Sequence, residues 1–71
     1  MNEQAPSTGD LIRRARQRKR MTQAQLATAL GVTRISVTRW ESGQHFPLRL
    51  AGAIESELGI DLPLQPEAVT P

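Results

Sequence analysis

The chain has 71 residues and a formal net charge of +2, with nine Lys and Arg against seven Asp and Glu. This length supports one modest hydrophobic core and no second domain. With no cysteine and one histidine, the sequence holds no disulfide, no thiolate metal site and no constellation for acid–base or nucleophilic catalysis. We therefore expect a protein that is not an enzyme and that uses no metal or cofactor.

The charge is distributed unevenly along the chain. Residues 1–40 carry a balance of +6 and residues 41–71 a balance of −4. Such a distribution turns one part of a molecule toward a polyanion and keeps the acidic part away from it. The chain also holds no apolar run near the ~20 residues that span a bilayer, and the first ten residues lack the pattern of a signal peptide.

The first predicted helix follows a polar segment, residues 1–7, that we expect to be flexible. Either Ser7 or Thr8, followed by Asp10, can cap this helix, which is expected to continue to about Arg20. Its apolar stripe consists of Leu11, Ile12 and Ala15. Basic side chains cover the rest of its surface: Arg13, Arg14, Arg18, Lys19 and Arg20. Met21 is expected to fill a gap beside the stripe.

The second predicted helix covers residues 23–30. Thr22 can accept a bond from the first turn, and Gln25, three residues later, can return one, which makes a capping box. Gly31 then ends the helix, because glycine reaches the left-handed conformation without steric cost. The inward face holds three apolar residues: Leu26, Ala27 and Leu30.

The third predicted helix starts after a short turn in which Val32 fills the corner and Thr33 caps the helix. It is expected to run from Arg34 to about Ser42, where Gly43 closes it. Two short amphipathic helices joined by a turn that contains glycine predict a helix-turn-helix.

One side of the third helix carries unusual side chains for a helix surface. At about 100° per residue, four residues share an arc opposite Val37 and Trp40, which are expected to be buried: Arg34, Ile35, Thr38 and Arg39. Arginine makes paired bonds to guanine O6 and N7, and an apolar group contacts the thymine methyl, so this arc is suited to a DNA major groove. A merely solvated face is the alternative for the two arginines, and base stacking is the less favoured role for Trp40.

A fourth helix is predicted from about Leu48 to Leu58, because Pro47 stops the third helix and Gly59 can end the fourth. Its inward residues are Leu50, Ala51, Ile54 and Leu58. An apolar edge continues through Ile60, Leu62 and Leu64. Residues 63–71 are expected to be an irregular tail, since they contain three prolines.

As a set, these residues resemble the Cro/repressor-type (Xre-like) helix-turn-helix regulators of phages and bacteria, over about residues 10–62. The elements that carry the resemblance are Thr22-Gln23-x-x-Leu26-Ala27, Gly31-Val32-Thr33, Val37-x-x-Trp40-Glu41-x-Gly43, Pro47 and Leu58-Gly59. The resemblance implies an all-α fold, a compact bundle of four or five helices of the lambda repressor-like kind, with residues 8–62 as the DNA-binding domain. It also implies a cytoplasmic, nucleoid-associated regulator of transcription that binds double-stranded DNA, usually as a homodimer on a palindromic operator.

The resemblance also assigns roles by position. Arg34, Ile35 and Arg39 would face bases, with Thr38 beside them. Arg16 and Glu41 would form an ion pair that ties the first helix to the third, although an ordinary surface pair is the alternative. Phosphate or supporting contacts are expected from Gln23, Thr33, Ser36, Ser42 and Gln44, and also from Arg18 and Lys19 if the basic run is more than a solvated face. The expected core consists of Leu11, Ile12, Leu26, Ala27, Leu30, Val32, Val37, Trp40, Ile54 and Leu58.

The sequence departs from the family pattern at two places. Glu55 stands where the family usually has a small residue, which affects the packing of the fourth helix. The loop 44–47 lacks basic residues, so phosphate contacts on that side are expected to be weaker.

A rival interpretation from another class is a protein-interaction module, such as an antitoxin or adaptor with the same fold. Its apolar surface would come from Leu50, Leu62, Leu64 and Val69. The two roles can coexist in one protein.

Overall fold

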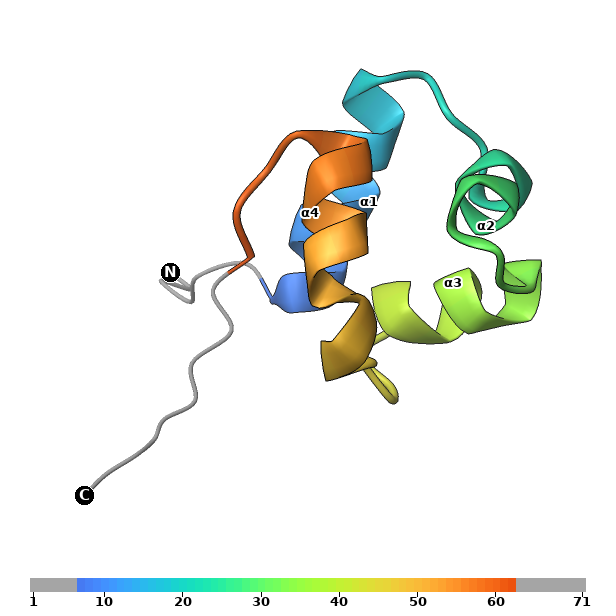
Figure 1. Cartoon of the computed structure of the whole chain (residues 1–71), viewed down its shortest axis with the longest axis vertical. Helices are drawn as coiled ribbons and strands as arrows, with labels where there is room; N and C mark the ends of the chain where they lie inside the picture. The colour runs from blue at the N-terminus through green and yellow to red at the C-terminus, as the bar shows by residue number, and fades with distance from the viewer. Residues whose placement is uncertain (1–6, 63–71) are drawn as a thin grey trace, which may run out of the picture.

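The structure, a computed structural model, describes residues 7–62, and every regular secondary-structure element in this range is a helix. In chain order the elements are α1 (Thr8–Arg18), α2 (Gln23–Leu30), α3 (Arg34–Glu41), the short 3-10 helix η1 (Leu48–Leu50) and α4 (Ala51–Leu58). In Figure 1, α4 lies against α1 on one side of the bundle, while α2 and α3 form the other side and α3 runs along its lower edge. The predicted all-α fold with a helix-turn-helix is therefore confirmed.

The helix starts follow from local capping. Ser7, rather than Thr8, caps α1, because its hydroxyl accepts a bond from the Asp10 N–H at 3.1 Å. The capping box before α2 is also present, with Thr22 and Gln25 bonded in both directions at 2.8 and 3.0 Å. These bonds satisfy N–H groups that the first turn of a helix leaves without partners.

All four α-helices end in the same way, with a left-handed residue followed by a bond from the next N–H back to the carbonyl five residues earlier. Glycine takes the left-handed position after α2, α3 and α4, but Arg20 takes it after α1, with φ of 58°. The Met21 N–H then bonds the Arg16 carbonyl at 3.0 Å. Helix α1 therefore stops at Arg18, earlier than predicted, and the Met21 side chain packs on the core.

The core receives one fully buried side chain from each α-helix: Ile12, Leu26, Val37 and Ile54. Trp40 packs beside them and meets Phe46 edge to face, with ring centroids 6.4 Å apart. Other buried core residues are Ala15, Ala27, Ala51, Leu58 and Leu62, and partly buried residues packed against them include Leu11, Leu30, Val32 and Leu50. The four helices thus share one core that fixes the orientation of α3.

Gly9 allows a close contact that the sequence analysis did not predict. The first turn of α1 lies directly on the last turn of α3, so a Cβ at Gly9 would overlap the carbonyl oxygens of Trp40 and Glu41. The start of one helix, with its partial positive charge, thereby faces the negative end of another. This contact and the core together hold α3 against α1.

The fourth helix differs from its predicted form. Residues Leu48–Leu50 wind as the tighter 3-10 helix, with the Leu50 N–H bonded to the Pro47 carbonyl at 2.9 Å, and the α-helix begins only at Ala51. No side chain caps either start. The half-buried Glu55 is accommodated without disturbing α4, because its carboxylate accepts a bond from the Leu62 N–H at 2.7 Å.

Some expectations lie outside the described residues. They concern residues 1–6 and 63–71, including the flexible start of the chain, the irregular tail and the apolar Leu64 and Val69. Among the helices of residues 7–62, each is too short or too polar to cross a bilayer.

Candidate nucleic-acid interface

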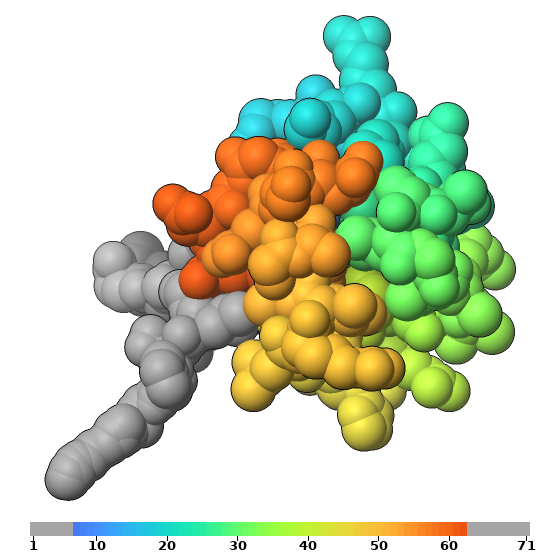
Figure 2. Space-filling model, in the orientation of Figure 1, coloured from blue at the N-terminus to red at the C-terminus, as the bar shows by residue number. Residues whose placement is uncertain are grey.

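The outer side of α3 is open to solvent. Arg34, Thr38 and Arg39 are exposed, and Ile35 keeps 58% of its surface accessible, which is unusual for a large apolar side chain. Figure 2 shows α3, in yellow-green, at the surface along the lower right edge, where α4 does not cover it. Val37 and Trp40 lie on the opposite side in the core. The structure thus places the four residues of the predicted arc together on an accessible surface.

An ion pair connects the inner side of α3 to α1. The Arg16 guanidinium binds both carboxylate oxygens of Glu41, with Nε to Oε2 at 2.6 Å and Nη2 to Oε1 at 3.0 Å. Only 10% of the Arg16 side chain and 5% of that of Glu41 are accessible. Arg16 also donates to the Met21 carbonyl at 2.8 Å. A paired, buried geometry of this kind fixes position as well as charge.

Gln23 lies between α2 and α3 and bonds within the protein at both ends of its amide. Its Nε2 donates to Glu41 Oε1 at 3.1 Å, and its Oε1 accepts a bond from the Thr38 hydroxyl at 3.0 Å. One amide N–H and one lone pair are left over for a ligand. Sequence reasoning expected a DNA contact from Gln23 and missed these two bonds.

The remaining supporting residues lie around the ends of α3. Thr33 caps the helix by accepting from the Ser36 N–H at 3.2 Å, and the two hydroxyls lie 3.2 Å apart. At the other end the Ser42 hydroxyl donates to the Arg39 carbonyl at 3.0 Å, and Gln44 reaches Ser42 at 3.4 Å. Their polar side chains flank the exposed arc at both ends.

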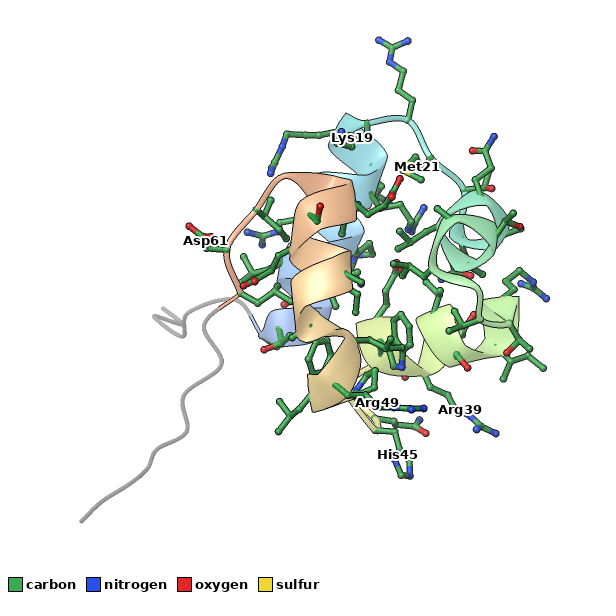
Figure 3. The ribbon with its side chains drawn as sticks, viewed as in Figure 1. Lys19, Met21, Arg39, His45, Arg49 and Asp61 are labelled. Atoms are coloured by element: carbon green, nitrogen blue, oxygen red, sulfur yellow. The ribbon has the colours of Figure 1, made fainter. Side chains whose placement is uncertain are left out.

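Some of the basic residues lie at opposite ends of the molecule. In Figure 3, Arg39, His45 and Arg49 project from the lower end of the molecule, whereas Lys19 lies at the upper end. Arg18 belongs to the same last turn of α1 that leads to Lys19. The expected phosphate contacts from the end of α1 therefore come from a surface remote from Arg39.

Arg49 is a member of the lower group that sequence reasoning did not select. It follows the loop 44–47, whose lack of Lys and Arg suggested weak phosphate contacts, and it is the only Lys or Arg after Arg39 in the sequence. A single arginine in this otherwise acidic part of the sequence was the feature that could have identified Arg49 as a candidate phosphate contact. His45 precedes it with a left-handed backbone, φ 43°, at the turn out of the helix-turn-helix.

Acidic side chains are gathered elsewhere. Within residues 41–62 the exposed or half-buried carboxylates belong to α4 and the residues after it, and Figure 3 shows Asp61 on the side away from α3. No group of three potential metal ligands occurs within residues 7–62. The surface around Arg39 therefore carries an excess of positive charge.

The comparisons with known proteins agree with this geometry. A helix-turn-helix family model matches residues 12–65, which is more than half of the chain. Comparison with the curated proteins gives no match.

Among solved structures, the crystal structure of FeII HppE in complex with substrate is similar with a TM-score of 0.72 at 25% sequence identity. The alignment covers 96% of this chain and 44% of that chain, so this chain spans less than half the length of that protein. On the family match and the helix-turn-helix geometry together, the chain belongs to the Cro/C1-type, Xre-like helix-turn-helix family of DNA-binding proteins.

Proposed function

We propose that this chain is a sequence-specific, repressor-like regulator of transcription that places α3 in the major groove of double-stranded DNA. The observation that carries the proposal is the exposed arc of Arg34, Ile35 and Arg39 on a helix whose other side is fixed in the core. The major groove is about 12 Å wide and admits an α-helix. The proposed domain is residues 8–62, and the proposed site of action is the nucleoid, without catalysis or cofactor.

The outer residues of α3 supply the sequence preference. Arg34 and Arg39 are suited to paired bonds with guanine O6 and N7, and the exposed Ile35 is suited to the thymine methyl. The ion pair between Arg16 and Glu41, together with the core, supports this role, because a helix that is held rigidly loses little entropy when it binds.

A second set of residues fixes the register on the duplex. Ser42 and Gln44 at the end of α3 and Arg49 beyond the loop lie on the same side of the molecule as Arg39 or next to it in the chain. Contacts from such residues to phosphate oxygens position a protein without carrying sequence information. We assign no direct contact to Lys19, because it lies at the other end of the molecule.

A homodimer is part of the proposal because family members usually bind palindromic operators. Two recognition helices would then meet half-sites about 34 Å apart, one turn of the duplex. Leu48, which is 70% exposed beside the end of α3, is a large apolar side chain available for such contacts.

The rival role as a protein-interaction module receives less support from the structure. Leu62, one member of its expected apolar surface, is buried in the core, and Leu50 is half-buried against it. Within the described residues this leaves Leu48 as the exposed large apolar residue of that region. The described surface is therefore better suited to a charged ligand than to an apolar one.

Selection of bound sequences from a random duplex library tests the proposal. We expect a motif that contains guanines, with a twofold symmetry and a half-site spacing of about one helical turn. The affinity for the selected duplex should fall steeply as salt rises, because bound phosphates release counterions. Enrichment of no sequence, or an affinity that salt leaves unchanged, would contradict the proposal and favour a protein partner.

A further inference from the structure

A continuous line of hydrogen bonds runs from the buried ion pair to the exposed arc of α3. It starts at Arg16, passes through the carboxylate of Glu41 and the amide of Gln23, and ends at the hydroxyl of Thr38. The three distances are 3.0, 3.1 and 3.0 Å. The line joins three different helices, because its members come from α1, α2 and α3.

Each bond in this line has a fixed direction. The Glu41 carboxylate is paired with Arg16 and accepts hydrogen bonds only. Gln23 must therefore turn its NH2 group toward Glu41, because the opposite orientation would bring two acceptor oxygens together. Its carbonyl oxygen then faces Thr38, and this oxygen needs a donor.

The consequence for Thr38 is that its only hydroxyl proton stays within the protein. The hydroxyl lies 3.0 Å from Gln23 Oε1 and 3.1 Å from the Arg34 carbonyl, and both partners are acceptors. Whichever bond dominates, the proton points inward. The exposed side chain of Thr38 is left with a lone pair of its oxygen and with its methyl group to offer to a ligand.

We infer that Thr38 reads DNA as a hydrogen-bond acceptor only, and that Gln23 is a positioning residue that sets this polarity together with the Arg34 carbonyl. The inference rests on the proposed function, because it requires α3 in the major groove. The major-groove donors are the amino groups of cytosine N4 and adenine N6, whereas guanine O6 and thymine O4 are acceptors. On the strand that Thr38 faces, the protein should prefer cytosine or adenine and reject guanine and thymine.

Library selection with Thr38→Val tests the acceptor role, since valine keeps the shape and loses the oxygen. Wild type should select cytosine or adenine at one position of each half-site, and Thr38→Val should relax that position and no other. On the selected duplex the variant should bind about 2- to 12-fold more weakly, as expected for one hydrogen bond. Thr28→Val, the same change at an exposed site on α2, is the matched control and should alter no position.

Gln23→Met tests the positioning role, because methionine keeps the length of the side chain and removes the amide. The Thr38 hydroxyl then loses one of its two inward acceptors, so discrimination against guanine and thymine should weaken at the Thr38 position while the rest of the motif persists. A purely structural role for Gln23 would instead reduce affinity equally for every sequence. Thermal unfolding of both variants checks that the fold is kept.

The outcomes separate the two proposals. A motif in which Thr38→Val relaxes a guanine or thymine, or relaxes no position, would overturn the acceptor role and leave the proposed function intact. A uniform loss in Gln23→Met would overturn the positioning role. A wild-type protein that selects no motif at all would overturn both the proposed function and the inference.

Discussion

The eight residues of α3 divide between two sides of the helix, which make opposite kinds of interaction. On the inner side, Val37 and Trp40 are buried in the core and Glu41 is bound by Arg16. On the outer side, Arg34 and Arg39 are exposed, and neither forms an ion pair with residues 7–62. The comparison teaches that the residues that hold this short helix in the fold are separate from those to which the proposed function assigns DNA recognition. Substitutions on the inner side should affect folding, and those on the outer side should affect DNA binding.

The largest effect is expected on the inner side, from Glu41→Ala. This change leaves the buried Arg16 guanidinium without its partner, so the free energy of unfolding should fall by about 3–5 kcal/mol. Urea denaturation followed by circular dichroism measures it. The control is Arg16→Met combined with Glu41→Leu, which removes both charges and should restore most of the stability. If the double variant is as unstable as the single one, the unpaired charge is not the cause.

The next effect concerns the contact between α1 and the end of α3. Gly9→Ala places a methyl group against the carbonyls of Trp40 and Glu41, so the two helices must move apart at a cost of about 1–3 kcal/mol. Gly52→Ala is the matched control, because a Cβ there meets no atom within 4 Å and alanine favours the helix by about 0.5–1 kcal/mol. The midpoint temperature of thermal unfolding should therefore fall in Gly9→Ala and rise in Gly52→Ala. A shift of the same sign in both variants would refute the close contact.

On the outer side, Arg34→Ala and Arg39→Ala should each weaken binding to the selected duplex by about 1–3 kcal/mol, or roughly 5- to 160-fold. Their unfolding should stay within about 0.5 kcal/mol of wild type, as for other surface substitutions. Fluorescence anisotropy against duplexes with single base-pair changes should show that each variant loses preference at one position. Equal losses on every duplex would assign both arginines to phosphate contacts.

The smallest effect is expected from the basic residues outside α3. Arg49→Ala should reduce the slope of log affinity against log salt by about 1, because one phosphate contact is lost. Lys19→Ala should leave the slope unchanged, since Lys19 projects from the other end of the molecule. A change of slope in Lys19→Ala would show that the duplex also reaches the end of α1.

The sequence predicts those parts of the fold that depend on neighbouring residues. The capping box at Thr22 and Gln25 and the end of α2 at Gly31 depend on spacings of a few residues, and the structure contains both. The burial of Val37 and Trp40 follows from helical periodicity alone. Local chemistry and the helical repeat are thus sufficient for most of the helix-turn-helix.

The parts that the sequence did not predict depend on contacts between distant segments. The need for glycine at position 9 follows only from its contact with the end of α3, which lies far from it in the sequence. Gln23 forms hydrogen bonds with Thr38 and Glu41, which lie 15 and 18 positions further along the chain, so no pattern of neighbouring residues predicts these bonds. Arg49 joins the surface of Arg39 only because the loop after α3 turns back. The exposed residues of α3 could therefore be predicted from the sequence, whereas the roles of the residues around the helix could not.

The glycine at the start of α1 has a consequence for how binding preference can change. The backbone of α1 contacts the backbone of α3 where Gly9 lies on the last turn of α3, so α3 is not free to rotate about its own axis. A relative with a different target sequence would need new side chains at the outer positions, because the angle at which the helix is presented is already set. Relatives with this architecture would then differ in binding preference through the outer side chains of α3, while the orientation of the helix stays the same.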